Sequence, residues 1–72
     1  MNTYPAKLIK YLQTLSEHEQ EQKKELYDRI YDTAVKNKFQ SARFWAMRQI
    51  VSGLSSAQID QKIKKRLHKI LP

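Results

Sequence analysis

Apolar residues recur at helical spacing in the first fifteen positions of the chain. Four of them, at spacings of three, four and seven residues, share one helical face: Leu8, Tyr11, Leu12 and Leu15. Pro5 suits the first position of a helix, because the N–H that proline lacks would have no partner there. The pattern predicts a first helix of about three turns, which begins near Pro5 and ends at Ser16.

The second segment starts with polar residues and becomes amphipathic only later. Ser16 and Glu19 have the spacing of a capping box, in which a hydroxyl and a carboxylate each bind a free amide at the helix start. Asn37 tolerates the left-handed conformation that ends many helices, and Phe39 would then fold back into the core. A long helix from Ser16 to about Asn37 is expected. Its apolar side consists of Leu26, Ile30 and Ala34, flanked by Tyr27, Tyr31 and Val35.

Two further amphipathic segments lie on either side of the single glycine. Ser41 is expected to cap a helix over 42–52, and Gly53 to end it in the left-handed conformation. Ser55 and Gln58 form a second capping-box pair, followed by a helix that ends near residue 70. The stripe predicted for the third helix is Phe44, Met47, Ile50 and Val51, with Leu54 just beyond. The last helix has the clearest stripe, Ile59, Ile63, Leu67 and Ile70.

Together these elements predict an all-α fold, a small single-domain bundle of about four helices that comprises residues 1–72. A chain of this length buries only a modest core, so a partner or a second copy in a homodimer would add stability. The uncharged stretches are too short to cross a bilayer, and the N-terminal segment lacks the features of a signal peptide. The sequence therefore predicts a cytoplasmic protein that does not associate with membranes.

Positive charge is concentrated in the second half of the chain. Residues 1–35 carry five Lys or Arg and six Asp or Glu, whereas residues 36–72 carry nine Lys or Arg and one acid, Asp60. The halves have net charges of −1 and +8, which give the total of +7. Such asymmetry favours a polyanionic partner, although a solvated basic surface is the simpler alternative.

The last helix holds much of this charge opposite its apolar stripe. Five basic residues lie between Lys62 and Lys69, more than are needed to complement a helix dipole. A rigid basic face of this kind could lie along phosphates, and glutamine or lysine near the helix start could reach base edges. The predicted nucleic-acid-binding residues are Lys62, Lys65, Arg66, Lys69, Gln58, Gln61, Arg43 and Arg48.

The last two helices and the turn between them resemble a helix-turn-helix over about twenty residues. Gly53 and Leu54 occupy the turn, Ser55 and Ser56 open the second helix, and Ile59 provides its apolar anchor. Arg48 and Gln49 depart from the pattern, because an apolar residue and an alanine usually stand at such positions. The departure favours an ordinary helical hairpin within a bundle.

Residues suited to catalysis are scarce. The chain has no cysteine, one glycine and two histidines, His18 and His68, which are far apart in sequence. No HExxH motif or histidine pair at a four-residue spacing occurs, and a glycine-rich phosphate loop is excluded. The serines are better explained as helix caps. The sequence predicts a protein that is not an enzyme and uses neither a metal nor another cofactor.

The leading hypothesis is a small non-enzymatic nucleic-acid-binding protein, most simply a bacterial or phage regulator that lays its basic C-terminal helix on the phosphate backbone. The alternative is a protein-interaction module, an adaptor or inhibitor that docks on an acidic or aromatic-binding partner. Two surfaces are candidates for this docking, the aromatic residues Tyr27, Tyr31 and Trp45 or the acidic start of the second helix. Each of the three aromatic residues belongs either to the core or to such an interface. A self-assembling structural protein is a third possibility.

Overall fold

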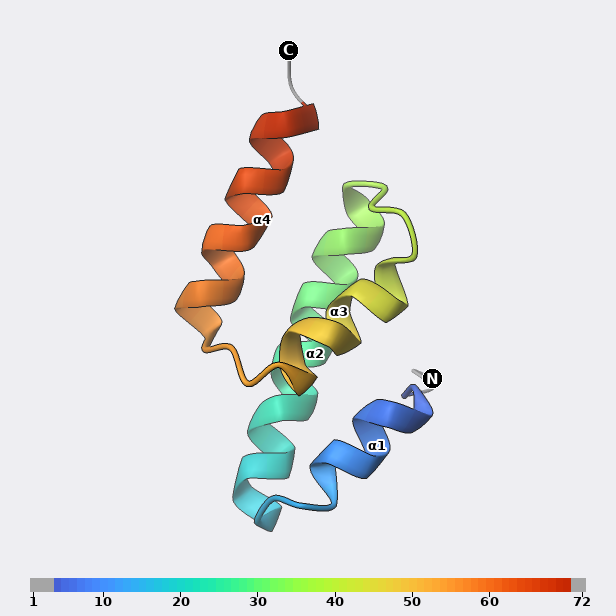
Figure 1. Cartoon of the computed structure of the whole chain (residues 1–72), viewed down its shortest axis with the longest axis vertical. Helices are drawn as coiled ribbons and strands as arrows, with labels where there is room; N and C mark the ends of the chain where they lie inside the picture. Colours follow the sequence, from blue (N-terminus) through green and yellow to red (C-terminus); the bar gives the residue numbers. More distant parts are fainter. Residues whose placement is uncertain (1–3, 71–72) are drawn as a thin grey trace.

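Four helices account for most of the part of the chain that the structure describes. The computed structural model describes the backbone of residues 4–70 and the side chains of residues 4–68. The helices are α1 (Ala6–Leu12), α2 (Glu17–Lys36), α3 (Ala42–Val51) and α4 (Ser56–Ile70), and this part of the chain contains no strand. In Figure 1, α2 extends along much of the molecule, α3 crosses it, and α4 rises along one edge. The predicted all-α fold of about four helices is confirmed.

The core is built from one apolar side of each helix together with one loop residue. α3 packs against both α2 and α1, and α4 adds its side chains from the edge of the molecule. Removing each large apolar side chain from water stabilises the fold by about 1.5–3 kcal/mol. The buried apolar residues are Leu8, Leu12, Tyr27, Ile30, Ala34, Phe39, Ala46, Met47, Ile50, Ile59 and Ile63.

The stripes predicted for α2 and α4 are largely confirmed. Ile30 and Ala34 are fully buried in α2, and Ile59 and Ile63 are buried in α4. Leu67 is half-buried against the same core. The side chain of Ile70, the last member of the predicted stripe, lies outside the described residues. The side of a long helix that faces the core can therefore be predicted from the sequence alone when its apolar stripe is wide.

The stripe predicted for α3 is partly wrong. Phe44 and Val51 are 52% and 37% exposed, whereas Ala46 and Gln49 are buried. At about 100° per residue, Phe44 and Val51 lie on roughly the opposite side of the helix from Ala46. The buried side chain of Gln49 donates a hydrogen bond from Nε2 to the Trp45 carbonyl, 3.1 Å away. This bond within the helix lowers the cost of burying the amide.

The first helix is one turn shorter than predicted. Pro5 is the N-cap residue in an extended conformation, and the helix ends at Leu12. The Thr14 hydroxyl donates to the Tyr11 carbonyl over 2.7 Å, a local bond that competes with continued helix. Leu15 still packs against the core from the following turn.

The predicted capping boxes form at both α2 and α4, with one difference. At α4 the Ser55 hydroxyl accepts from the Gln58 N–H over 3.2 Å, and Gln58 Oε1 accepts from the Ser55 N–H over 2.9 Å. At α2 the Ser16 hydroxyl accepts from the Glu19 N–H over 3.3 Å. The Glu19 carboxylate accepts from the Ser16 hydroxyl instead of the backbone N–H. Only the α4 box therefore has both backbone bonds of the motif.

Two residues are expected to end helices in the left-handed conformation, and one of them does. At the other helix end, the following residue takes this conformation instead. Asn37 has φ −95°, and Lys38 takes the left-handed conformation instead, with φ 57°. The Phe39 N–H then bonds back to the Ala34 carbonyl over 2.8 Å, which carries the Phe39 ring into the core as expected. Gly53 ends α3 with φ 75°, as predicted.

The expected cap by Ser41 is wrong. Ser41 does precede α3, but its backbone is left-handed, with φ 52°, and its side chain makes no capping bond. A capping side chain needs an extended backbone to reach the free amides of the first turn.

Replacing Ser55 by alanine is therefore expected to lower the free energy of unfolding by about 1 kcal/mol, the usual contribution of a working N-cap. Denaturant unfolding followed by circular dichroism measures the change, with an unaltered m-value. Ser41→Ala is the matched control, because Ser41 makes no capping bond, and it should cost less than half as much. Equal losses in the two variants would contradict this account of the helix ends.

Candidate nucleic-acid interface

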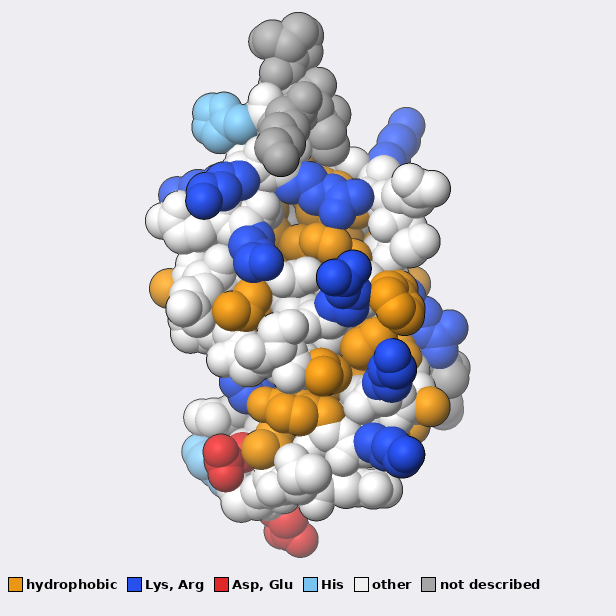
Figure 2. All heavy atoms as spheres, viewed as in Figure 1, with side chains coloured by type: hydrophobic (Ala, Val, Ile, Leu, Met, Phe, Trp, Pro, Cys, Tyr) orange, Lys and Arg blue, Asp and Glu red, His pale blue; other side chains and the backbone are white. Residues whose placement is uncertain are grey.

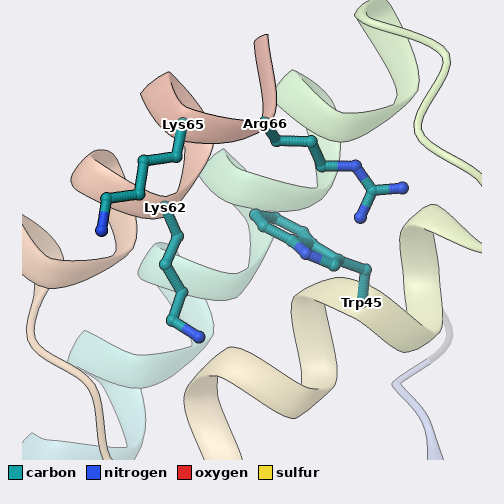
Figure 3. Close-up of a pocket in the computed structure, with 4 residues that line it drawn as sticks. All are labelled: Trp45, Lys62, Lys65 and Arg66. Atoms are coloured by element: carbon teal, nitrogen blue, oxygen red, sulfur yellow. The ribbon is translucent and has the colours of Figure 1, made fainter. Parts of the chain in front are cut away.

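An open groove between α3 and α4 is lined by one aromatic and three basic side chains. Its volume is about 370 Å³, and we call it the α3–α4 groove. Figure 3 shows Lys62 and Lys65 on one side of the indole and the Arg66 guanidinium on the other. None of the described residues that line the groove is acidic. The lining residues are Trp45, Lys62, Lys65 and Arg66.

Aromatic packing fixes the Arg66 end of the groove. The guanidinium carbon of Arg66 lies 4.4 Å from the centre of the Phe39 ring and 5.9 Å from that of Trp45. Phe39 and Trp45 meet edge to face, with ring centres 5.2 Å apart and planes at 80°. Stacking uses the flat face of a guanidinium, whereas phosphate is bound by the N–H groups in its plane. Arg66 can therefore hold α4 against the core and still bind an anion.

The positive charge of Lys62 and Lys65 is uncompensated within the described residues. Both side chains are exposed, and neither has an ion-pair partner there. Asp60, the single acid of the second half of the chain, is turned towards α2 instead. Arg29 of α2 binds its carboxylate over 3.1 Å and the Ser56 hydroxyl over 2.9 Å. The carboxylate that is nearest to Lys62 in the sequence is therefore paired with Arg29 and does not neutralise the groove.

The structure brings together only part of the predicted site. Arg43 is two residues before Trp45, so it lies about 160° away around α3 and does not line the groove. It is hydrogen-bonded to the Tyr27 hydroxyl: burial raises the pKa of Tyr27, and Arg43 opposes that rise. Arg48 is exposed on α3 but is not among the lining residues.

The two glutamines and Lys69 differ from one another in their surroundings. The side-chain oxygen of Gln58 is engaged in the cap of α4, so contact with a base would compete with that hydrogen bond. Gln61 is exposed. The side chain of Lys69 lies outside the described residues.

Trp45 is the groove residue whose role the sequence leaves open. The indole is half-buried and packs on the core, yet it also lines the α3–α4 groove. The sequence does place Trp45 on the same side of α3 as Arg48. This position points to a groove only when the path of α4 along that side is known. By contrast, Tyr27 is 1% exposed and stacks on Tyr31 with ring centres 5.9 Å apart. Tyr27 is therefore a core residue, so of the two places that the sequence leaves open for it, core and interaction surface, the structure shows the core.

The face that carries α3 in the foreground is mainly basic. Figure 2 shows Lys and Arg side chains over much of this face, interleaved with apolar ones, and acidic side chains only near its lower end. The acidic residues of the first half of the chain belong largely to α2. A polyanion that approaches this face therefore meets attraction over a wide area.

Comparisons with protein-family models, with curated proteins and with solved structures give no match. Within the described residues, no helix is both long and apolar enough to cross a membrane. The same part of the chain holds no cluster of three His, Cys, Asp or Glu residues placed to bind a metal ion. The chemistry of the α3–α4 groove is therefore the guide to function.

Proposed function

We propose that this protein is a small non-enzymatic nucleic-acid-binding regulator of the cytoplasm that lays the basic face of α4 on a phosphate backbone. The observation that carries the proposal is the gathering of Lys62, Lys65 and Arg66 at the α3–α4 groove with no acidic residue among its described lining. Clustered cations of this kind supply most of the affinity in sequence-independent nucleic-acid binding.

The three cations have different parts in this proposal. Lys62 and Lys65 are exposed and one turn apart, so both ammonium groups can bind phosphates of one strand. Arg66 is anchored on the Phe39 ring and offers a guanidinium that can bind a phosphate through two N–H groups. Gln58 and Gln61 are both exposed on α4, and Gln58 is engaged in the cap of the helix, so Gln61 is the glutamine that can reach a ligand without breaking that cap.

A salt titration tests the proposal. Binding of a fluorescently labelled oligonucleotide is measured by anisotropy at several salt concentrations. Three phosphate contacts predict a slope of about −2.7 for log K against log salt on a duplex and about −2.1 on a single strand. Absence of binding at low salt, or affinity that does not change with salt, would disprove the proposal.

A second candidate function is a protein-interaction module, and the exposed apolar residues of α3 favour it. Phe44 and Val51 are seven residues apart on one line of the helix, and Arg48 lies between them. An apolar line with a cation beside it suits an acidic amphipathic partner or a second copy of the chain. Phe44→Ser separates the two functions, because it should abolish such docking and leave nucleic-acid binding unchanged.

A further inference from the structure

We infer that the α3–α4 groove takes single-stranded nucleic acid, with the Trp45 indole stacking on a base while the surrounding cations hold the adjacent phosphates. This inference rests on the proposed function and narrows it from nucleic acid in general to unpaired strands. It uses a residue, Trp45, that phosphate binding alone does not require.

The aromatic residue among the cations is the first argument for unpaired strands. A duplex presents phosphates and base edges, and the flat faces of its bases are covered by their neighbours. A single strand exposes those faces, and proteins that bind single strands combine a basic groove with aromatic side chains on which bases stack. Trp45 lies between Lys62 and Lys65 on one side and Arg66 on the other, which is this combination.

The indole is also held in position before any ligand binds. Trp45 meets Phe39 edge to face at 80°, so the core fixes its orientation without stacking a parallel ring on it. The residue is half-buried, with its remaining surface in the open groove. A rigid aromatic surface binds a base with little loss of side-chain freedom.

The dimensions of the groove give the third argument. Its volume of about 370 Å³ is near the lower end of the range for small-molecule sites, about 300–1,000 Å³. Such a space suits a flipped or unpaired nucleotide and is too small to admit a duplex. The groove is open to solvent, which leaves room for the strand to enter and leave.

The first test uses the intrinsic fluorescence of the unmodified protein. Trp45 is the single tryptophan of the chain, so its emission reports on the groove alone. The probes are oligo(dT) and oligo(rU) of about 12 nucleotides, a DNA hairpin duplex with the same number of phosphates, and heparin. Stacking predicts strong quenching by one or both single strands, and their relative affinities distinguish DNA from RNA. Equal quenching by the duplex or by heparin, which has no bases, would overturn the inference.

The second test removes the aromatic surface. Trp45→Leu keeps an apolar side chain against Phe39, and its single-strand affinity should fall about tenfold while its duplex affinity stays unchanged. Phe44→Leu is the matched control, because Phe44 is an exposed aromatic neighbour outside the groove, and it should have no effect. Circular dichroism verifies that both variants are folded. Unchanged single-strand affinity in folded Trp45→Leu would overturn the inference, and if that variant does not fold, the fluorescence test decides.

Failure of the inference and failure of the proposed function give different results. A protein that binds duplex and single strands equally, with the expected salt dependence, keeps the proposed function and loses the stacking role of Trp45. A protein that binds neither probe at low salt loses both.

Discussion

Reversing two charges at the groove, in the variant Lys62→Glu/Lys65→Glu, is expected to weaken nucleic-acid binding about 25- to 60-fold at about 0.1 M salt. Each lost phosphate contact removes the release of roughly 0.7–0.9 counterion, so log K should fall by about 1.4–1.8 for two contacts. The slope of log K against log salt should become shallower by the same amount. Anisotropy titrations at several salt concentrations measure both quantities.

The matched control for this variant is Lys7→Glu/Lys10→Glu. It changes the net charge of the protein equally, but both lysines are exposed on α1 and neither lines the α3–α4 groove. We expect its affinity to fall by less than about tenfold, because the loss comes only from the long-range field. Equal losses in the two variants would show that binding follows net charge and that α4 has no special part in it.

Replacing Ile59 by alanine is expected to lower the free energy of unfolding by about 3 kcal/mol. Ile59 has no exposed surface, and it and Ile63 are the two buried apolar side chains of α4 among the described residues. For a domain of this size the loss corresponds to a fall in Tm of roughly 12–24 °C. Thermal unfolding followed by circular dichroism measures it.

Ile9→Ala removes the same atoms from a side chain that is 44% exposed on α1, and it serves as the control. Its Tm should fall by only a few degrees, because the substitution removes less buried apolar surface than Ile59→Ala does. If Ile59→Ala were no more damaging than Ile9→Ala, α4 would not be packed as described. The α3–α4 groove would then lack a fixed wall.

Local patterns in the sequence predict α4 well. Its capping box depends on Ser55 and Gln58, three residues apart, and its buried line on apolar residues four apart, so neighbours in sequence suffice to define both. The face of α3 is different. That helix is short and contacts both α1 and α2, and the contact places the small Ala46 inwards and the large Phe44 outwards. Hydrophobicity alone favours the larger residue, so the sequence could not reveal this choice.

The positive charge of the candidate site could also be predicted from the sequence. Which side chains meet at the site could not. The cluster of basic residues from Lys62 to Arg66 is evident in the sequence. The pairing of Asp60 with Arg29 joins residues 31 positions apart, and it decides which side of α4 stays uncompensated. The approach of Trp45 to α4 likewise depends on how two helices pack. Non-local contacts of this kind have no signature in a local pattern.

The stacking of Arg66 on Phe39 also affects the entropy of binding. An arginine that is free in solution loses up to about 2 kcal/mol of rotamer freedom when a ligand fixes it. Arg66 is already held over the Phe39 ring at 4.4 Å, so folding has restricted much of that freedom before a phosphate arrives. Lys62 and Lys65 are exposed and lose their freedom only on binding. Under the proposed function, Arg66 is therefore the one of three equal charges whose contact with a phosphate is least opposed by entropy.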